Sequence, residues 1–320
     1  MAATVVVYIL LSLFVVSTFV YVIFLSALIR FRNKEPFNSA FFKICFVLGV
    51  CDVSNLLNEW FLAKFPSYGW LGMKLVVQWK PDLVAKLAIM ISWGMCFAQL
   101  NGVFLLSLNR YTAVVKAFKH SVIWTTNTVV LAVLLQVGIP VLLIFPQSFM
   151  SFHYHEDNAT GSLIPLFTNS TYQVYKQFEC VLSCFQMNYF KLALIYNAVI
   201  NLSVGVMYVR IFWRLHRNKA SITSSPMSVS GNPAQSIDKL DVKLAFFGFA
   251  LFLIMLVLCF YTFLMSMAHS AQMQALYLQI HFVILDVFSW ANPWLCLATS
   301  ATIRNHFVAT LLCRKPPPNA

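Results

Sequence analysis

The sequence has 320 residues, of which 60% are hydrophobic and only 10% are charged, and its mean hydropathy is +0.76. A soluble domain carries about 45–50% apolar and about 25% charged residues, so these proportions exclude a soluble globular domain and a disordered chain. The net charge of +12 would suit a nucleic-acid-binding protein, but a multi-pass membrane protein also collects Lys and Arg in its cytoplasmic loops. We therefore expect a membrane protein that contacts lipid and no nucleic acid.

Seven segments are long and apolar enough to cross a bilayer, which takes about 20 mostly apolar residues. The first contains no charge before Arg30 and lacks the basic start of a cleavable signal peptide, so we predict a retained span. Five polar residues interrupt the second: Lys43, Asp52, Asn55, Asn58 and Glu59. We expect Lys43, at the inner end, to extend its ammonium to the membrane surface, and the other four to form a stripe that faces the bundle interior. The predicted fold class is all-α, one domain covering 1–320 with spans at about 5–29, 40–62, 87–109, 122–145, 188–211, 243–268 and 276–301.

The distribution of positive charge predicts the orientation of the bundle. With the N-terminus outside, sixteen of the 22 Lys and Arg residues fall in cytoplasmic segments, as the positive-inside rule requires. The loop between spans four and five carries two glycosylation sequons, which start at Asn158 and Asn169 and are usable only in the lumen. The N-terminus is therefore predicted to be extracellular and the C-terminus cytoplasmic. The Lys residues left outside are Lys64, Lys74, Lys80, Lys86, Lys176 and Lys191.

Two cytoplasmic segments have distinct compositions. Residues 212–242 are predicted to form a flexible loop, because 218–237 are rich in Ser, Pro and Gly and contain no aromatic residue. Residues 302–320 form a short cytoplasmic tail. Its part from Arg304 to Lys315 alternates basic and apolar residues, which indicates an interfacial helix or a frayed tail. Cys313, beside basic residues, is a candidate for palmitoylation.

Two motifs lie in the third and seventh predicted spans. Asn109, Arg110 and Tyr111 stand at the inner end of span three, where an Arg suits a coupling switch, although any inner helix end accepts a positive residue. Asn292-Pro293 lies within span seven, where the proline frees a backbone carbonyl for a polar neighbour or simply kinks the helix.

Asp52 is a carboxylate at mid-depth in span two, which is costly unless it has a partner. Counted along the helices at about 1.5 Å per residue, Asp52 and Asn292 both lie roughly 14–18 Å from the inner membrane surface. We therefore expect an intramembrane polar network of Asp52, Asn292 and Pro293, closed directly, through water or through a sodium ion. No other cofactor and no protein metal site is expected. Three further polar residues in the spans are candidates for a ligand pocket: Gln99, His281 and Asp286.

The motifs resemble a known family. Residues 108–115 (LNRYTAVV), Asp52 and Asn292-Pro293 look like those of a seven-helix G-protein-coupled receptor. That octapeptide, with 37–42 (FNSAFF) and 48–52 (LGVCD), resembles the nematode serpentine chemoreceptors, most of all their V and gamma classes. The resemblance implies a plasma-membrane receptor of ciliated sensory neurons.

The chain departs from the broader receptor pattern. Asn109 replaces the usual acidic neighbour of Arg110, Cys296 replaces the usual Tyr after Asn-Pro, and span six has no Pro. The usual bridge from span three to the second outer loop lacks its first cysteine, so the loop residues Cys180 and Cys184 either pair with each other or stay free.

The sequence therefore predicts a chemosensory receptor that binds a small molecule in its outer half and activates a heterotrimeric G protein. A transporter or channel is the alternative, with Asp52 and Asp286 on an ion path. No enzyme motif is present, so no enzyme is expected. Because Asn109 is not acidic, Asp241 at the start of span six is the first candidate partner of Arg110, and Asp238 is the second. Both could instead pair with Lys239 and Lys243 on their own helix.

Overall fold

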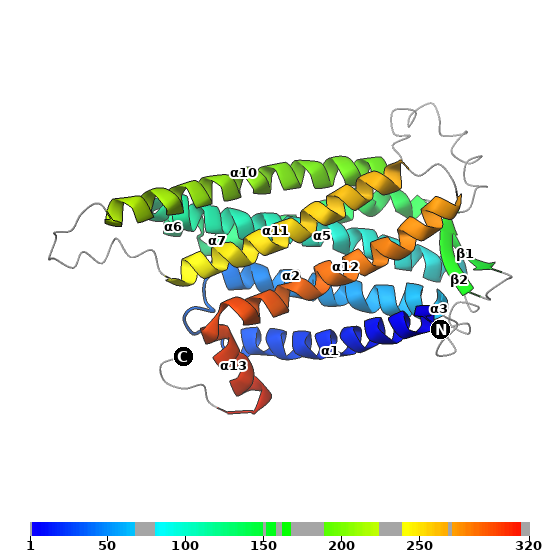
Figure 1. The fold of residues 1–320 in the computed structure, drawn as a ribbon, viewed down its shortest axis with the longest axis horizontal. Coiled ribbons are helices and arrows are strands. Elements are labelled where there is room, and N and C mark those ends of the chain that lie inside the picture. Colours follow the sequence, from blue (N-terminus) through cyan, green and yellow to red (C-terminus); the bar gives the residue numbers. More distant parts are fainter. Residues whose placement is uncertain are drawn as a thin grey trace.

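The computed structural model describes residues 2–67, 81–149, 152–157, 162–167, 189–223, 239–267 and 271–314. Seven long helical elements run side by side in one bundle (Figure 1). They are α1 (Ala2–Arg30), α2 (Ala40–Asn58) with the π-helix η1 (Glu59–Lys64), α5 (Pro81–Val115), α7 (Thr126–Ile144), α10 (Tyr189–Thr223), α11 (Lys239–Ser266) and α12 (Ala271–Thr299).

Short elements mark the two ends of the bundle. The N-terminus, α3 (Phe65–Ser67), the 3-10 helix η2 (Phe145–Phe149) and the strands β1 (Phe152–Asp157) and β2 (Ser162–Phe167) lie at one end, called here the hairpin end. The helices α6 (Ala117–Ile123) and α13 (Ala301–Leu311) lie at the other, the α13 end (Figure 1). The strands pair antiparallel with Phe152 opposite Phe167. This hairpin is the one β element of the described residues, and the sequence analysis did not predict it.

The predicted fold class, a seven-helix membrane bundle, is confirmed. Six helices of the described residues are long and apolar enough to cross a membrane, and Val283–Thr299 of α12 adds a shorter apolar stretch. The second span ends in a π-helix. Of the polar residues that interrupt this span, Asp52, Asn55, Asn58 and Glu59 are buried, as expected for an inner stripe, and Lys43 is exposed.

The core of the bundle lies around α5, which packs against α2, α7, α10 and α11. Its centre is filled by large side chains that are essentially inaccessible to solvent, including Phe41, Leu48, Phe97, Leu100 and Tyr208. The exposed side chains of the spans are also mostly apolar, as expected for helices whose surroundings are lipid. Polar side chains are therefore concentrated inside the bundle.

The predicted loop 212–242 is partly wrong, because α10 continues as helix to Thr223 and α11 begins at Lys239. The start of the extension packs against α11: the ring of Phe212 lies 5.1 Å from that of Phe249 and 5.7 Å from that of Phe246. The residues that favour loops, such as Pro226, follow only after the helix, and 224–238 lie outside the described residues.

The predicted tail 302–320 begins with the helix α13, which turns away from α12 (Figure 1). Ser300 caps it, because its hydroxyl accepts a hydrogen bond from the Ile303 N–H at 3.3 Å. Arg304 donates to the Leu297 and Ala298 carbonyls at the end of α12, and His306 packs edge-on against Phe31 at 4.6 Å. The sharp turn between α12 and α13 is therefore fixed by capping at both helix ends.

Candidate functional site

A buried polar cluster around Asp52 joins four helices. The Asp52 carboxylate is 2% exposed, and its Oδ2 accepts hydrogen bonds from the Tyr21 hydroxyl of α1 and from Asn292 Nδ2 of α12 at 3.3 Å. Its Oδ1 accepts from Gln99 Nε2 of α5 at 2.8 Å, and the same nitrogen donates to Ser289 Oγ of α12 at 2.8 Å. The carboxylate thus links α1, α2, α5 and α12 at one point.

The helical periodicity explains why these side chains meet. Ser289 and Asn292 are three residues apart on α12, so both face the same neighbour. Pro293 follows Asn292 inside the helix and is buried. Because proline has no N–H, the Ser289 carbonyl four residues earlier lacks its usual helical partner, which favours polar neighbours at this level. Asp52 and Asn292, which were predicted to lie at the same depth, are in direct contact.

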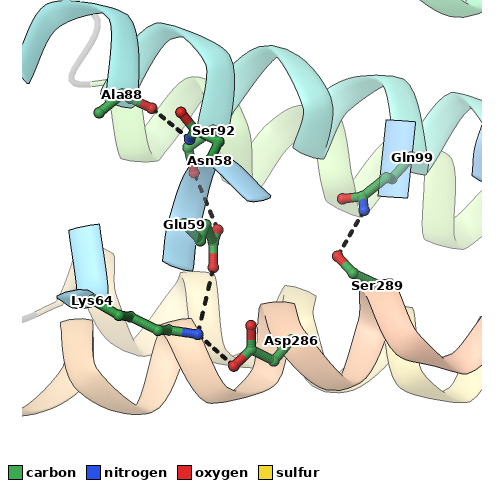
Figure 2. A network of polar contacts seen from close by, with 8 residues as sticks. All are labelled: Asn58, Glu59, Lys64, Ala88, Ser92, Gln99, Asp286 and Ser289. Atoms are coloured by element: carbon green, nitrogen blue, oxygen red, sulfur yellow. Dashed lines mark hydrogen bonds and ion pairs between the residues drawn. The ribbon is translucent and has the colours of Figure 1, made fainter. Parts of the chain in front are cut away.

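A second buried cluster, toward the hairpin end, contains three charged side chains, those of Glu59, Lys64 and Asp286 (Figure 2). The Lys64 ammonium forms an ion pair with the Asp286 carboxylate of α12 and lies 4.0 Å from Glu59 Oε2. The Ser92 hydroxyl of α5 donates to Glu59 Oε1 at 3.2 Å. Lys64 Nζ also lies 4.8 Å from the centroid of the Trp60 ring. Lys64 is 4% exposed and Asp286 is fully buried, so this is an interior charge cluster rather than a surface ion pair.

The π-helix η1 brings Glu59 and Lys64 together. In an α-helix, residues five apart point in directions about 140° from each other. In a π-helix, residues five apart are joined by the backbone hydrogen bond and lie one turn from each other. The π turn therefore places the Lys64 side chain on the same inner face as Glu59, although both follow an α-helix whose period would separate them.

The predicted switch residues lie at the α13 end of α5. Asn109 and Arg110 are buried, and the Arg110 guanidinium donates to Asn109 Oδ1 at 2.8 Å. The guanidinium carbon also lies 4.4 Å from the centroid of the Phe41 ring. The Tyr111 hydroxyl accepts a hydrogen bond from Arg210 of α10 at 3.4 Å. Asn109 thus provides a neutral contact where an acidic residue was expected from the broader receptor pattern.

Several predicted residues are not tested by these contacts. The side chains of Asp241 and His281 lie outside the described part of the structure, as do the whole residues Asn158, Asn169, Cys180 and Cys184. Cys313 is described: it is exposed just beyond α13 and has a left-handed backbone conformation, with φ 50°. Its exposure is compatible with palmitoylation, which stays a prediction.

Comparison with known proteins assigns the family. The model of the family described as "Serpentine type 7TM GPCR chemoreceptor Srv" matches residues 10–313. The chain belongs to this family. It is also 28% identical over 296 residues to "Serpentine receptor class V-1" of Caenorhabditis elegans, a match that covers 92% of this chain and 84% of that protein. The resemblance to serpentine chemoreceptors is confirmed, and of the two classes it named, the comparisons support V. The family is one of membrane receptors, not of enzymes.

In this Srv receptor, the structure brings together some predicted residues and separates others. Gln99, predicted for a ligand pocket, belongs to the Asp52 cluster, whereas Asp286 belongs to the Lys64 cluster. The two clusters are nevertheless adjacent, because Asp286 and Ser289 are three residues apart on one face of α12 (Figure 2).

Sequence reasoning missed two functional candidates in this Srv receptor. Tyr21 lies in an uncharged apolar run, where an aromatic residue gives no sign of a buried hydrogen bond. Lys64 was placed outside the membrane, because it follows the predicted span at 40–62. The polar interruptions at Asn58 and Glu59 were the available signal that the helix continues past them on a polar inner face.

Proposed function

We propose that this chain is a chemosensory G-protein-coupled receptor that binds a small molecule toward the hairpin end and a heterotrimeric G protein at the α13 end. The N-terminus would lie outside, in the plasma membrane and by family resemblance in the sensory cilium. The observation that carries the proposal is the Asp52 cluster, in which one buried carboxylate joins four helices of the bundle. The chain that holds this cluster belongs to a family of chemoreceptors.

Helix α12 provides the physical link between the two ends. It carries Asp286 in the charged cluster and Asn292 in the Asp52 cluster, two side chains separated by about 9 Å along the helix. A ligand that displaces α12 at the first cluster also changes the hydrogen bonds at the second. Such a ligand shifts a two-state equilibrium only by its difference in affinity for the two states.

The α13 end supplies the surface for the G protein. Arg110 lies there, where its guanidinium contacts Asn109 and the ring of Phe41. An opening of the helices at this end would release Arg110 from Asn109 and Phe41 to a partner. Palmitoylation of Cys313 would anchor the adjoining α13 at the membrane surface. A sodium ion near Asp52 would replace at least one of the three donors that now contact the carboxylate.

The proposal is tested in a reporter cell that expresses the receptor with a G-protein readout and is exposed to a panel of volatile and water-soluble metabolites. Arg110→Ala should abolish the response to an active compound while ligand binding and surface level stay as in the wild type. Arg30→Ala, which removes an exposed arginine near the same end, is the control and should retain the response. A response that survives Arg110→Ala unchanged contradicts the proposed switch.

An ion-conducting protein is the second candidate, because three charged side chains of the hairpin end are buried inside the bundle. The two functions differ in one measurement. A ligand-evoked current that persists when G-protein signalling is blocked would favour conduction, whereas its loss would favour the receptor.

A further inference from the structure

The charged cluster of the hairpin end has the composition of a binding site for an ammonium ion. The Lys64 ammonium contacts the Asp286 carboxylate, lies 4.0 Å from Glu59 and lies 4.8 Å from the centroid of the Trp60 ring. Carboxylates and the face of an indole are the protein groups that bind alkylammonium ions best. The chain therefore already holds one alkylammonium group, its own, in a buried site made of these groups.

The same cluster has two carboxyl groups for one ammonium, so it carries one excess negative charge when both carboxyl groups are ionised. Glu59 and Asp286 share the single Lys64, and neither carboxylate has another ion-pair partner among the described residues. Asp286 Oδ1 is buried and accepts no hydrogen bond from any described residue. A buried charge without a full set of partners is costly, so a second cation stabilises this cluster whereas an anion is repelled.

The surroundings of Glu59 also lack hydrogen-bond partners. Asn55 precedes Glu59 by four residues on α2 and therefore lies on the same face. Its side-chain amide is buried and interacts with the Glu59 carboxyl group, but no hydrogen bond of full geometry joins it to a described residue. Asn58 donates to the Ala88 carbonyl at 2.9 Å, but its own side-chain oxygen accepts nothing from the described residues. Buried amides in this state indicate that a further polar group belongs between α2 and α12.

From these observations we propose that Asp286, with Glu59, binds a small protonated primary or secondary amine. The N–H groups of the ligand donate to Asp286 Oδ1, and Lys64 moves toward Glu59, so that each carboxylate gains a cation of its own. Single-turn π-helices occur often at functional sites, and η1 lets Lys64 stand between the two carboxylates. This inference rests on the proposed function only where it concerns the effect of the amine on signalling, because binding of the amine is measurable without a G protein.

The test measures thermal unfolding of the purified full-length chain in detergent. n-Butylammonium chloride should raise the unfolding temperature of the wild type, because a ligand at ten times its Kd favours the folded state about elevenfold. n-Butanol at the same concentration should not, since it lacks charge, and sodium chloride should raise the unfolding temperature less than n-butylammonium does, since the sodium ion lacks N–H donors. No shift with n-butylammonium, or an equal shift with either of the other two, would overturn the proposal.

Variants locate the site. Asp286→Asn should remove the shift and Glu59→Gln should weaken n-butylammonium binding at least tenfold, whereas Asp82→Asn, an exposed acidic residue of α5, should keep the shift. If Asp286→Asn does not fold, the double variant Lys64→Met/Asp286→Asn replaces it, because that variant also removes the lysine that would otherwise lose its partner. The double variant should show no shift. A shift retained without Asp286 overturns the assignment. Amine binding without any G-protein response would leave the site standing and refute the proposed function alone.

Discussion

Replacement of Asp52 by Asn removes one of the two acceptor oxygens at the centre of the polar cluster. Three donors converge on the carboxylate: the Tyr21 hydroxyl, Gln99 Nε2 and Asn292 Nδ2. An amide offers one oxygen and one NH2 group, so with the neighbouring side chains in their present orientations at least one of these donors must face another donor. The least costly orientation keeps the oxygen for Tyr21 and Asn292 and loses the contact with Gln99, which retains Ser289 as a partner.

The size of the effect follows from the lost contact. A hydrogen bond to a charged group contributes about 1.5–3 kcal/mol, and removal of the buried charge offsets part of that loss in folding stability. The surface level of Asp52→Asn should therefore stay within a few-fold of the wild type. If the resting and active states differ in this contact, the balance between them shifts by about 5–150-fold, the range that corresponds to 1–3 kcal/mol.

The assay compares basal and ligand-stimulated G-protein signalling at matched surface level. Ser54→Ala is the control, because the Ser54 hydroxyl only donates to the Val50 carbonyl of its own helix at 2.8 Å. Asp52→Asn should change basal output or ligand potency at least about five-fold relative to Ser54→Ala. If the variant instead loses ligand binding while coupling stays intact, Asp52 is part of the ligand pocket and the reasoning is refuted.

Three further predictions concern topology, packing and the switch. The two sequons between spans four and five should be glycosylated, so that glycosidase treatment increases gel mobility; unchanged mobility in a well-expressed sample would argue against an extracellular N-terminus. Gly248→Ala should destabilise the fold by about 1–3 kcal/mol and so lower the surface level, because the added Cβ would overlap the Tyr208 hydroxyl, whereas the Cβ added in Gly138→Ala meets no atom within 4 Å, so that variant is the control. Asp241→Ala should raise basal signalling, and the proposed lock with Arg110 is abandoned if neither it nor Asp238→Ala does so.

The helices and one polar pair were predictable from the sequence, because both depend on properties of single helices. Hydropathy locates spans wherever an apolar run is long enough, whatever its neighbours are. The depth of Asp52 and of Asn292 follows from counting residues along each helix, and a buried carboxylate needs a polar partner. The predicted loop failed at residues 212–223, where α10 continues as helix, and the contact of Phe212 with Phe249 of α11, which supports the start of this extension, is not visible in the sequence.

The charged cluster could not be predicted, because it depends on an irregular backbone and on contacts between helices. An α-helical period places Lys64 away from Glu59, and only the π turn of η1 returns it to the inner face. Tyr21 could not be recognised either, since its hydroxyl matters only once α1 packs against α2 and brings it to Asp52.

The uneven burial of the helices has a consequence for how this receptor diverges from its relatives. In the most apolar 18-residue stretch of α1 and of α7, 22% of the residues are buried, compared with 61% in α2. A side chain that meets lipid must be apolar but need not fit a particular neighbour, whereas a side chain between helices must keep its volume and shape. Substitutions should therefore accumulate fastest on α1 and α7, where Leu, Ile, Val and Phe exchange freely. Receptors that share little sequence on those two helices can thus retain the same interior.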